Sequence, residues 1–180
     1  MAERTLKAKA PKEKSQSDAR LHGDVVQAIV DGKHNDPFAV MGMHEAGGQF
    51  TARAFVPDAD TLEVLSLTGE PGGKKRQPLI YRARNGGGEW DVKDPYSFGP
   101  VLGPMDDYYI AEGSHLRLFD KFGAHIIDHE GAHGVHFAVW APNARSVSVV
   151  GDFNAWDGRV HQMRSLGGSG VWEIFVPGAG

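Results

Sequence analysis

The sequence contains no cysteine, which excludes a disulfide framework and any zinc site built on thiolates. No apolar run approaches the ~20 residues that a helix needs to cross a bilayer. The basic N-terminus also lacks the apolar segment of a secretory signal. We therefore expect no membrane partner and a cytoplasmic location.

Sequence motifs for nucleotide chemistry and nucleophilic catalysis are also missing. There is no G-x-S-x-G, no P-loop and no G-x-G-x-x-G that opens a helix. Paired carboxylates suit glycosidases, but here they are adjacent or in turns, so we predict no catalytic residue and no cofactor. The pairs are Asp58 with Asp60, Asp106 with Asp107, and Asp128 with Glu130.

Three histidines, His125, His129 and His133, recur at a spacing of four residues. On a helix this spacing would place three imidazoles on one face and suggest a metal site. Neighbouring glycines and Ile126-Ile127 favour a strand instead, where the rings would be roughly 13 Å apart. We therefore expect no metal.

Basic residues are concentrated at the N-terminus, where five of the first 16 residues are basic and two acidic, although the whole chain has a net charge of −4. A basic tail can bind nucleic acid. Residues 1–18 contain almost no large apolar side chain, and no aromatic–basic interleaving follows them. We predict a disordered leader and no nucleic-acid partner.

The stretch from Val135 to Trp156 organises the rest of the chain. Its two apolar-rich runs, 135–140 and 146–150, alternate with a period of two and predict consecutive strands. Ala141-Pro142-Asn143-Ala144 favours a turn between them. The loop 151–158 then presents a tryptophan, Trp156.

Other segments predict a mainly β protein. A short helix over Asp24–Gly32 would bury Val25, Val26, Ile29 and Val30. A second short helix is expected within 105–115. Further strands are expected at 49–57, 61–67, 78–84, 89–92 and 171–176.

Three segments of the second half resemble carbohydrate-binding module family 48: WAPNA (140–144), GDFNAWDGR (151–159) and SGVWEIFVPG (169–178). Upstream segments resemble the additional N-terminal β-domain of bacterial glycogen branching enzymes. They are DPF (36–38) with GMH (42–44), DPY (94–96) with FGP (98–100), and EGSH (112–115) with GAH (123–125).

The resemblance implies two tandem immunoglobulin-like β-sandwich domains, at 19–115 and 116–180, with the second one truncated. Two features depart from the family. A ten-residue loop at 68–77 stands where the family has a further strand pair, and Gln162 stands where branching enzymes usually have proline.

The resemblance also implies a function. Branching enzymes cut an α-1,4-glucan and join the piece through an α-1,6 branch, on a catalytic barrel absent from these residues. We expect this chain to bind α-glucan (glycogen and maltooligosaccharides), to dock on its own catalytic barrel and to be inactive alone. The alternatives are accessory domains without sugar contact, or the module of an isoamylase or trehalohydrolase.

The loop that contains Trp156 has the residue types that a glucan site needs. An aromatic ring can stack on the apolar face of a sugar while polar groups bond its hydroxyls. We predict Trp156 as the platform, with Asn154, Asp157 and Arg159 as polar contacts. The alternative is that Trp156 packs inside the protein. Trp140 is expected in the core rather than as a second platform.

Overall fold

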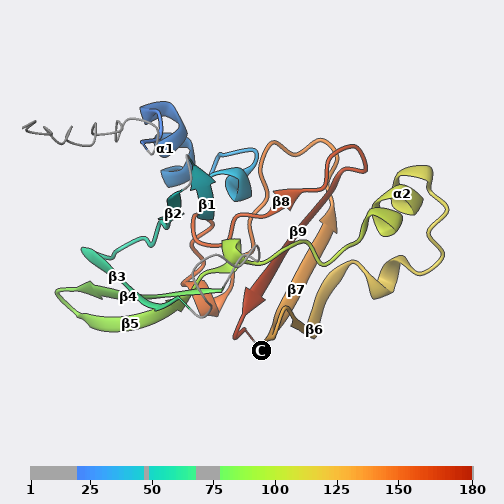
Figure 1. Ribbon diagram of the computed structural model, residues 1–180. Coiled ribbons are helices and arrows are strands. Elements are labelled where there is room, and N and C mark those ends of the chain that lie inside the picture. Colours follow the sequence, from blue (N-terminus) through green and yellow to red (C-terminus); the bar gives the residue numbers. More distant parts are fainter. Residues whose placement is uncertain (1–19, 47–48, 68–77, 180) are drawn as a thin grey trace, which may run out of the picture.

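The structure, a computed structural model, describes residues 20–46, 49–67 and 78–179. These residues form three antiparallel sheets and two short α-helices (Figure 1). The prediction of a mainly β protein with a short N-terminal helix is confirmed. The predicted leader at 1–18 and loop at 68–77 lie outside the described residues.

The N-terminal helix α1 spans Gly23–Val30 and buries a narrower stripe than predicted. Ile29 is buried and Val25 packs against the same cluster, but Val26 is 44% exposed. A helix of eight residues turns only about twice, so it presents little more than one side chain per turn to the core.

The first half contains a hairpin and a three-stranded sheet. In the hairpin, β1 (Gly42–Ala46) pairs with β2 (Gln49–Arg53). In the sheet, the order is β3 (Thr61–Leu67), β4 (Leu79–Asn85) and β5 (Gly88–Lys93). The strands β3, β4 and β5 agree with the sequence prediction to within a residue or so.

The second half forms a four-stranded sheet in the order β6-β7-β9-β8. Helix α2 (Pro104–Glu112) precedes this sheet in the chain. The strands are β6 (Gly123–His129), β7 (Ala132–Trp140), β8 (Arg164–Ser165) and β9 (Val171–Pro177).

The predicted strand at 146–150 is wrong. Both edges of β7 are occupied, by β6 and by β9, so the chain cannot fold back onto β7 after the Pro142 turn. The segment instead forms one isolated bridge, Ser148 with Gln162. The Val149 N–H donates to the His161 carbonyl at 2.9 Å, and the Trp156 loop lies between these two residues.

One hydrophobic core joins the two halves of the chain. Side chains from the first 115 residues pack with Trp172 and its neighbours on β9. The buried members are Ile29, Phe38, Val40, Met41 and Tyr96 from the first half, and Met163, Trp172, Ile174 and Val176 from the second.

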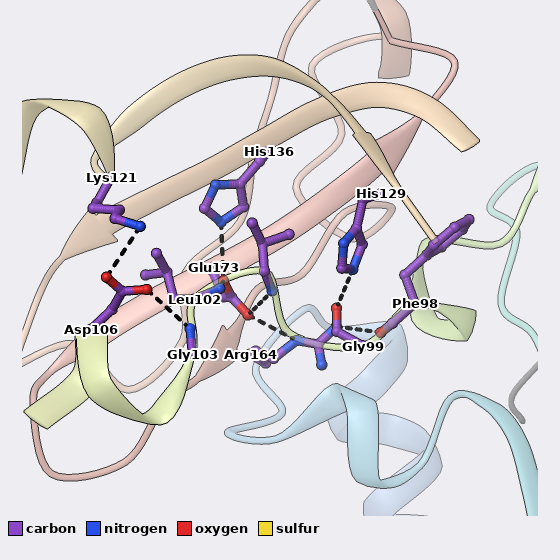
Figure 2. Close-up of polar contacts among 11 residues, drawn as sticks. Phe98, Gly99, Leu102, Gly103, Asp106, Lys121, His129, His136, Arg164 and Glu173 are labelled. Carbon is purple, nitrogen blue, oxygen red and sulfur yellow. Dashed lines mark hydrogen bonds and ion pairs between the residues drawn. The ribbon is translucent and has the colours of Figure 1, made fainter. Parts of the chain in front are cut away.

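A buried carboxylate, Glu173 on β9, holds in place the segment around Val101 and Leu102 that connects the two halves of the chain (Figure 2). It accepts hydrogen bonds from the N–H groups of Val101 and Leu102 at 3.2 and 3.0 Å, and from His136 Nε2 at 3.0 Å. A carboxylate suits this position because its two oxygens offer enough lone pairs for several donors.

Arg164 on β8 contacts the same connecting segment, at Phe98 and Gly99. Its guanidinium donates to the carbonyls of Phe98 and Gly99 at 2.6 and 3.3 Å, and lies 3.6 Å from the ring centroid of Phe38. The segment that we call the connecting strap, residues 98–103, is thus bonded to both β8 and β9 by buried side chains.

Candidate functional site

The loop 151–159 is held in a conformation that few residues adopt. After the short 3-10 turn η5 (Asp152–Asn154), Ala155 and Trp156 both have left-handed backbone angles, with φ of 51° and 60°. The N–H groups of Asn154 and Trp156 donate to the Gly151 carbonyl at 3.1 and 3.0 Å. These bonds turn the chain sharply and direct the tryptophan outward.

Trp156 is 66% exposed, although it is a large apolar side chain. Its indole N–H donates to Asp152 Oδ1 at 2.9 Å, which fixes the ring relative to the loop. The sequence left open whether this ring is exposed or packed inside, and the structure exposes it. The ring is therefore able to stack on a ligand.

Asp157 and Arg159 form a close pair beside the tryptophan. Arg159 Nε lies 2.9 and 3.0 Å from the two carboxylate oxygens, and its terminal nitrogen lies 2.6 Å from Oδ2. These hydrogen bonds from Arg159 lower the pKa of Asp157. Both side chains remain partly exposed, so the pair offers donors and acceptors of fixed geometry.

Asn154 is buried beneath the loop rather than placed on its surface. Its Oδ1 accepts from the Gly151 N–H at 2.9 Å, and its Nδ2 donates to the Val149 carbonyl and to His161 Nδ1. Burial lowers the pKa of His161 to about 4, so this imidazole is neutral near pH 7 and can accept. The amide of Asn154 thus shapes the loop from inside.

Of the four predicted residues, the structure places Trp156, Asp157 and Arg159 on the accessible side of one loop and Asn154 in its interior. Sequence reasoning missed Asp152 and His161, the partners that fix the indole and the buried amide. The only available signal was their position within or just after the GDFNAWDGR segment.

The prediction that Trp140 lies in the core is wrong. Trp140 is 60% exposed because it ends β7, and its indole N–H donates to the Ser169 carbonyl at 2.9 Å. Trp172, on the neighbouring strand, is the buried one and donates to the Ala141 carbonyl.

The three evenly spaced histidines have separate partners. His125 and His129 contact the carbonyls of Phe122 and Gly99, and His133 contacts Asp128. Among residues 20–46, 49–67 and 78–179, no group of three potential ligands could hold a metal ion. In the same part of the chain, no helix is both long and apolar enough to span a bilayer.

Comparison with known families gives two matches. Residues 121–180 match carbohydrate-binding module 48, described as the isoamylase N-terminal domain. Residues 22–79 match the N-terminal domain of the alpha-1,4-glucan branching enzyme GlgB.

Curated relatives agree with both matches. The 1,4-alpha-glucan branching enzyme GlgB of Mesorhizobium japonicum is 62% identical over 172 residues, which cover 86% of this chain and 23% of that protein. The enzyme of the same name from Rhizobium meliloti is 59% identical over 170 residues, covering 85% and 23%. The chain thus spans about a quarter of the length of these relatives.

Proposed function

We propose that this chain is the glucan-binding and barrel-docking region of a glycogen branching enzyme. Residues 22–79 match the N-terminal domain of the alpha-1,4-glucan branching enzyme GlgB, and residues 121–180 match carbohydrate-binding module 48. The parent enzyme would form α-1,6 branches in cytoplasmic glycogen. The observation that supports glucan capture most strongly is the exposed ring of Trp156, fixed by Asp152.

Binding would combine stacking with hydrogen bonding. A glucose unit would lay its apolar face on the indole of Trp156, while the Asp157–Arg159 pair would bond its hydroxyl groups. The ring and the ion pair are already held by bonds within the loop, so little conformational freedom would be lost on binding.

Native gel electrophoresis in glycogen tests this proposal. Trp156→Ala should weaken retardation by about tenfold or more, because an aromatic anchor supplies much of the energy of a small interface. Its melting temperature should be unchanged, since the ring is exposed. Trp140→Ala is the matched control: it removes an equally exposed tryptophan outside the loop and should leave retardation unchanged.

The second candidate is a purely structural accessory region. It is favoured if the wild-type chain migrates equally fast with and without glycogen. A loss of melting temperature in Trp156→Ala with unchanged retardation would likewise contradict the glucan site.

Docking to a catalytic barrel is supported by apolar side chains that the described residues leave uncovered. Met105 on α2 is 60% exposed, and Leu116 and Phe119, which follow it, are 94% and 71% exposed. We call these three residues the α2 surface. Because the relatives are about four times as long as the matched segment, the proposed occupant is the barrel of the same enzyme.

A further inference from the structure

The last part of the Trp156 loop and the residues just after it, 159–162, are bonded to the first half of the chain. The side chain of Gln162, which is buried, donates through Nε2 to the Ile29 carbonyl of α1 and to the Arg159 carbonyl of the loop, both at 3.1 Å. One amide thus joins the end of α1 to the residue that carries the proposed glucan donor.

The surroundings of the Gln162 amide set its orientation. Both neighbours are carbonyl oxygens, which only accept, so the amide must present its nitrogen to them. Its own oxygen, Oε1, is buried and has no hydrogen-bond partner among the described residues. A buried acceptor that stays unpaired costs stability, so the stability of the fold alone does not account for a glutamine here.

The backbone of the same residue is held by a second bond from the first half. The Gln162 N–H donates to the Tyr96 hydroxyl at 3.1 Å, and this hydroxyl donates to the Val160 carbonyl at 3.1 Å. The ring of Tyr96 is buried against Phe38, with the ring centroids 4.9 Å apart, so the core fixes the hydroxyl. Both the side chain and the backbone of Gln162 are therefore tied to the first half.

Arg159 also lies close to residues of the first half. A Cβ atom placed on Gly32, just after α1, would be 3.6 Å from Arg159 Cγ, so the stem of this arginine passes the end of the helix. The hydrogen bonds that Arg159 donates to Asp157 raise the pKa of its guanidinium, and the charge of Asp58 in the first half adds to this rise. The environment of the guanidinium thus comes from both halves of the chain.

We propose that Gln162 is a positioning residue of the glucan loop, which holds Arg159 beside α1 so that the Asp157–Arg159 pair is in place before a glucan binds. The proposal rests on the proposed function, in which this pair bonds the sugar hydroxyls. It adds that the first half of the chain sets the affinity of a loop in the second half. A loop that is ordered in advance loses less conformational freedom on binding, so removing the bond weakens binding without removing a contact to the sugar.

Calorimetric titration of the full chain with maltoheptaose tests this role. Gln162→Met keeps the length of the side chain and removes its amide, and it should weaken binding by about fivefold, the usual effect of one lost hydrogen bond. Tyr96→Phe keeps the packed ring and removes the hydroxyl, so it should weaken binding to a similar degree, and it serves as the test if Gln162→Met does not fold.

Val171→Ala is the matched control for a general loss of stability. Val171 is fully buried in a second cluster, with Leu102 and Ala138, away from the loop. This change should lower the melting temperature and leave maltoheptaose binding unchanged at a temperature at which all variants are folded.

A spectroscopic readout separates positioning from stability. In the sugar-free protein, the nuclear magnetic resonance signal of the Arg159 Nε–H, assigned by its absence in Arg159→Ala, reports the bonds to Asp157 at 2.9 and 3.0 Å. The signal should move towards that of a solvated arginine in Gln162→Met, and stay in place in Val171→Ala. A signal that does not move in Gln162→Met would overturn the positioning role.

The outcomes distinguish this inference from the proposed function. If Trp156→Ala loses binding while Gln162→Met and Tyr96→Phe bind maltoheptaose as the wild type does, the positioning role is wrong and the platform stands. Equal weakening in Val171→Ala would also overturn the positioning role, because affinity would then follow stability. If the wild type does not bind maltoheptaose, both are wrong.

Discussion

At the scale of single residues, the loop carries backbone strain next to its exposed ring. Ala155 and Trp156 adopt positive φ without being glycine, at a cost of about 1–3 kcal/mol each. Asn154 offsets this cost, because its amide bonds three groups of the loop and its surroundings. Strain that is supported in this way commonly marks a functional segment.

His161, which supports Asn154, should make stability depend on pH. Burial lowers its pKa from 6.5 to about 4 in the folded chain. Between these values the unfolded chain binds the proton and the folded chain does not, so this contribution falls as pH falls from 6.5 to 4 and is constant above 6.5.

His161→Gln should remove this dependence. The difference in free energy of unfolding between wild type and variant should decrease by about 3 kcal/mol from pH 6.5 to pH 4. Urea unfolding at several pH values measures it. Asp94, whose pKa burial raises to about 6, acts in the opposite direction but is present in both proteins. A difference that does not vary with pH would contradict the account.

Residue types in a motif indicate candidate site residues but do not show which of them are buried. The segment GDFNAWDGR identified Trp156, Asp157 and Arg159, which lie together on the loop. It could not show that Asn154 points inward, because Asn and Asp satisfy turns as readily as ligands. The exposure of Trp140 was missed because an alternating pattern does not show that its own strand, β7, ends at this residue.

At the scale of elements, the connecting strap 98–103 is bonded to β9 by one carboxylate. Glu173 accepts from two backbone N–H groups of the strap and from His136, and it is 1% exposed (Figure 2). Glu130 accepts from the Gly99 N–H of the same strap, but at an exposed site.

Glu173→Ala should therefore destabilise the chain far more than Glu130→Ala. The first change leaves several buried donors without an acceptor, at a cost of about 3 kcal/mol or more. The second removes an exposed bond worth under about 1 kcal/mol. The urea midpoints of the two variants, followed by circular dichroism, measure both losses of stability. Equal midpoints would show that the buried bonds of Glu173 stabilise the chain no more than the exposed bond of Glu130.

Strands with an alternating or strongly β-forming sequence were predictable. Whether a segment finds a partner strand was not. The strands β3, β4, β7 and β9 have strong β-forming or alternating sequences and were expected within about three residues of their bounds. The run at 146–150 has an equally strand-like sequence, but both edges of β7, the strand that precedes it, are already paired. Partner availability is a tertiary property that a local pattern does not contain.

At the scale of the whole molecule, residues from both halves of the chain share one core cluster. Ile29 and Phe38 pack with Trp172 and Ile174. The sequence suggested two domains because its motifs fall into two groups. Contacts between distant segments could not be deduced, since any apolar face could cover any other.

The α2 surface should bind a catalytic barrel in trans. The Mesorhizobium japonicum relative, truncated to the part beyond its match with this chain, should co-elute with it in size-exclusion chromatography. Leu116→Asp with Phe119→Asp should abolish co-elution, because charges replace exposed apolar contacts. Trp156→Ala should co-elute normally. Undiminished co-elution of the double variant would place docking elsewhere.

The most direct test of glucan capture follows the indole N–H signals of the four tryptophans by nuclear magnetic resonance during titration with maltoheptaose. The signal of Trp156, assigned by its absence in Trp156→Ala, should shift progressively and saturate. The signals of exposed Trp140 and buried Trp172 should stay in place. A Trp156 signal that does not move at any maltoheptaose concentration would contradict the site.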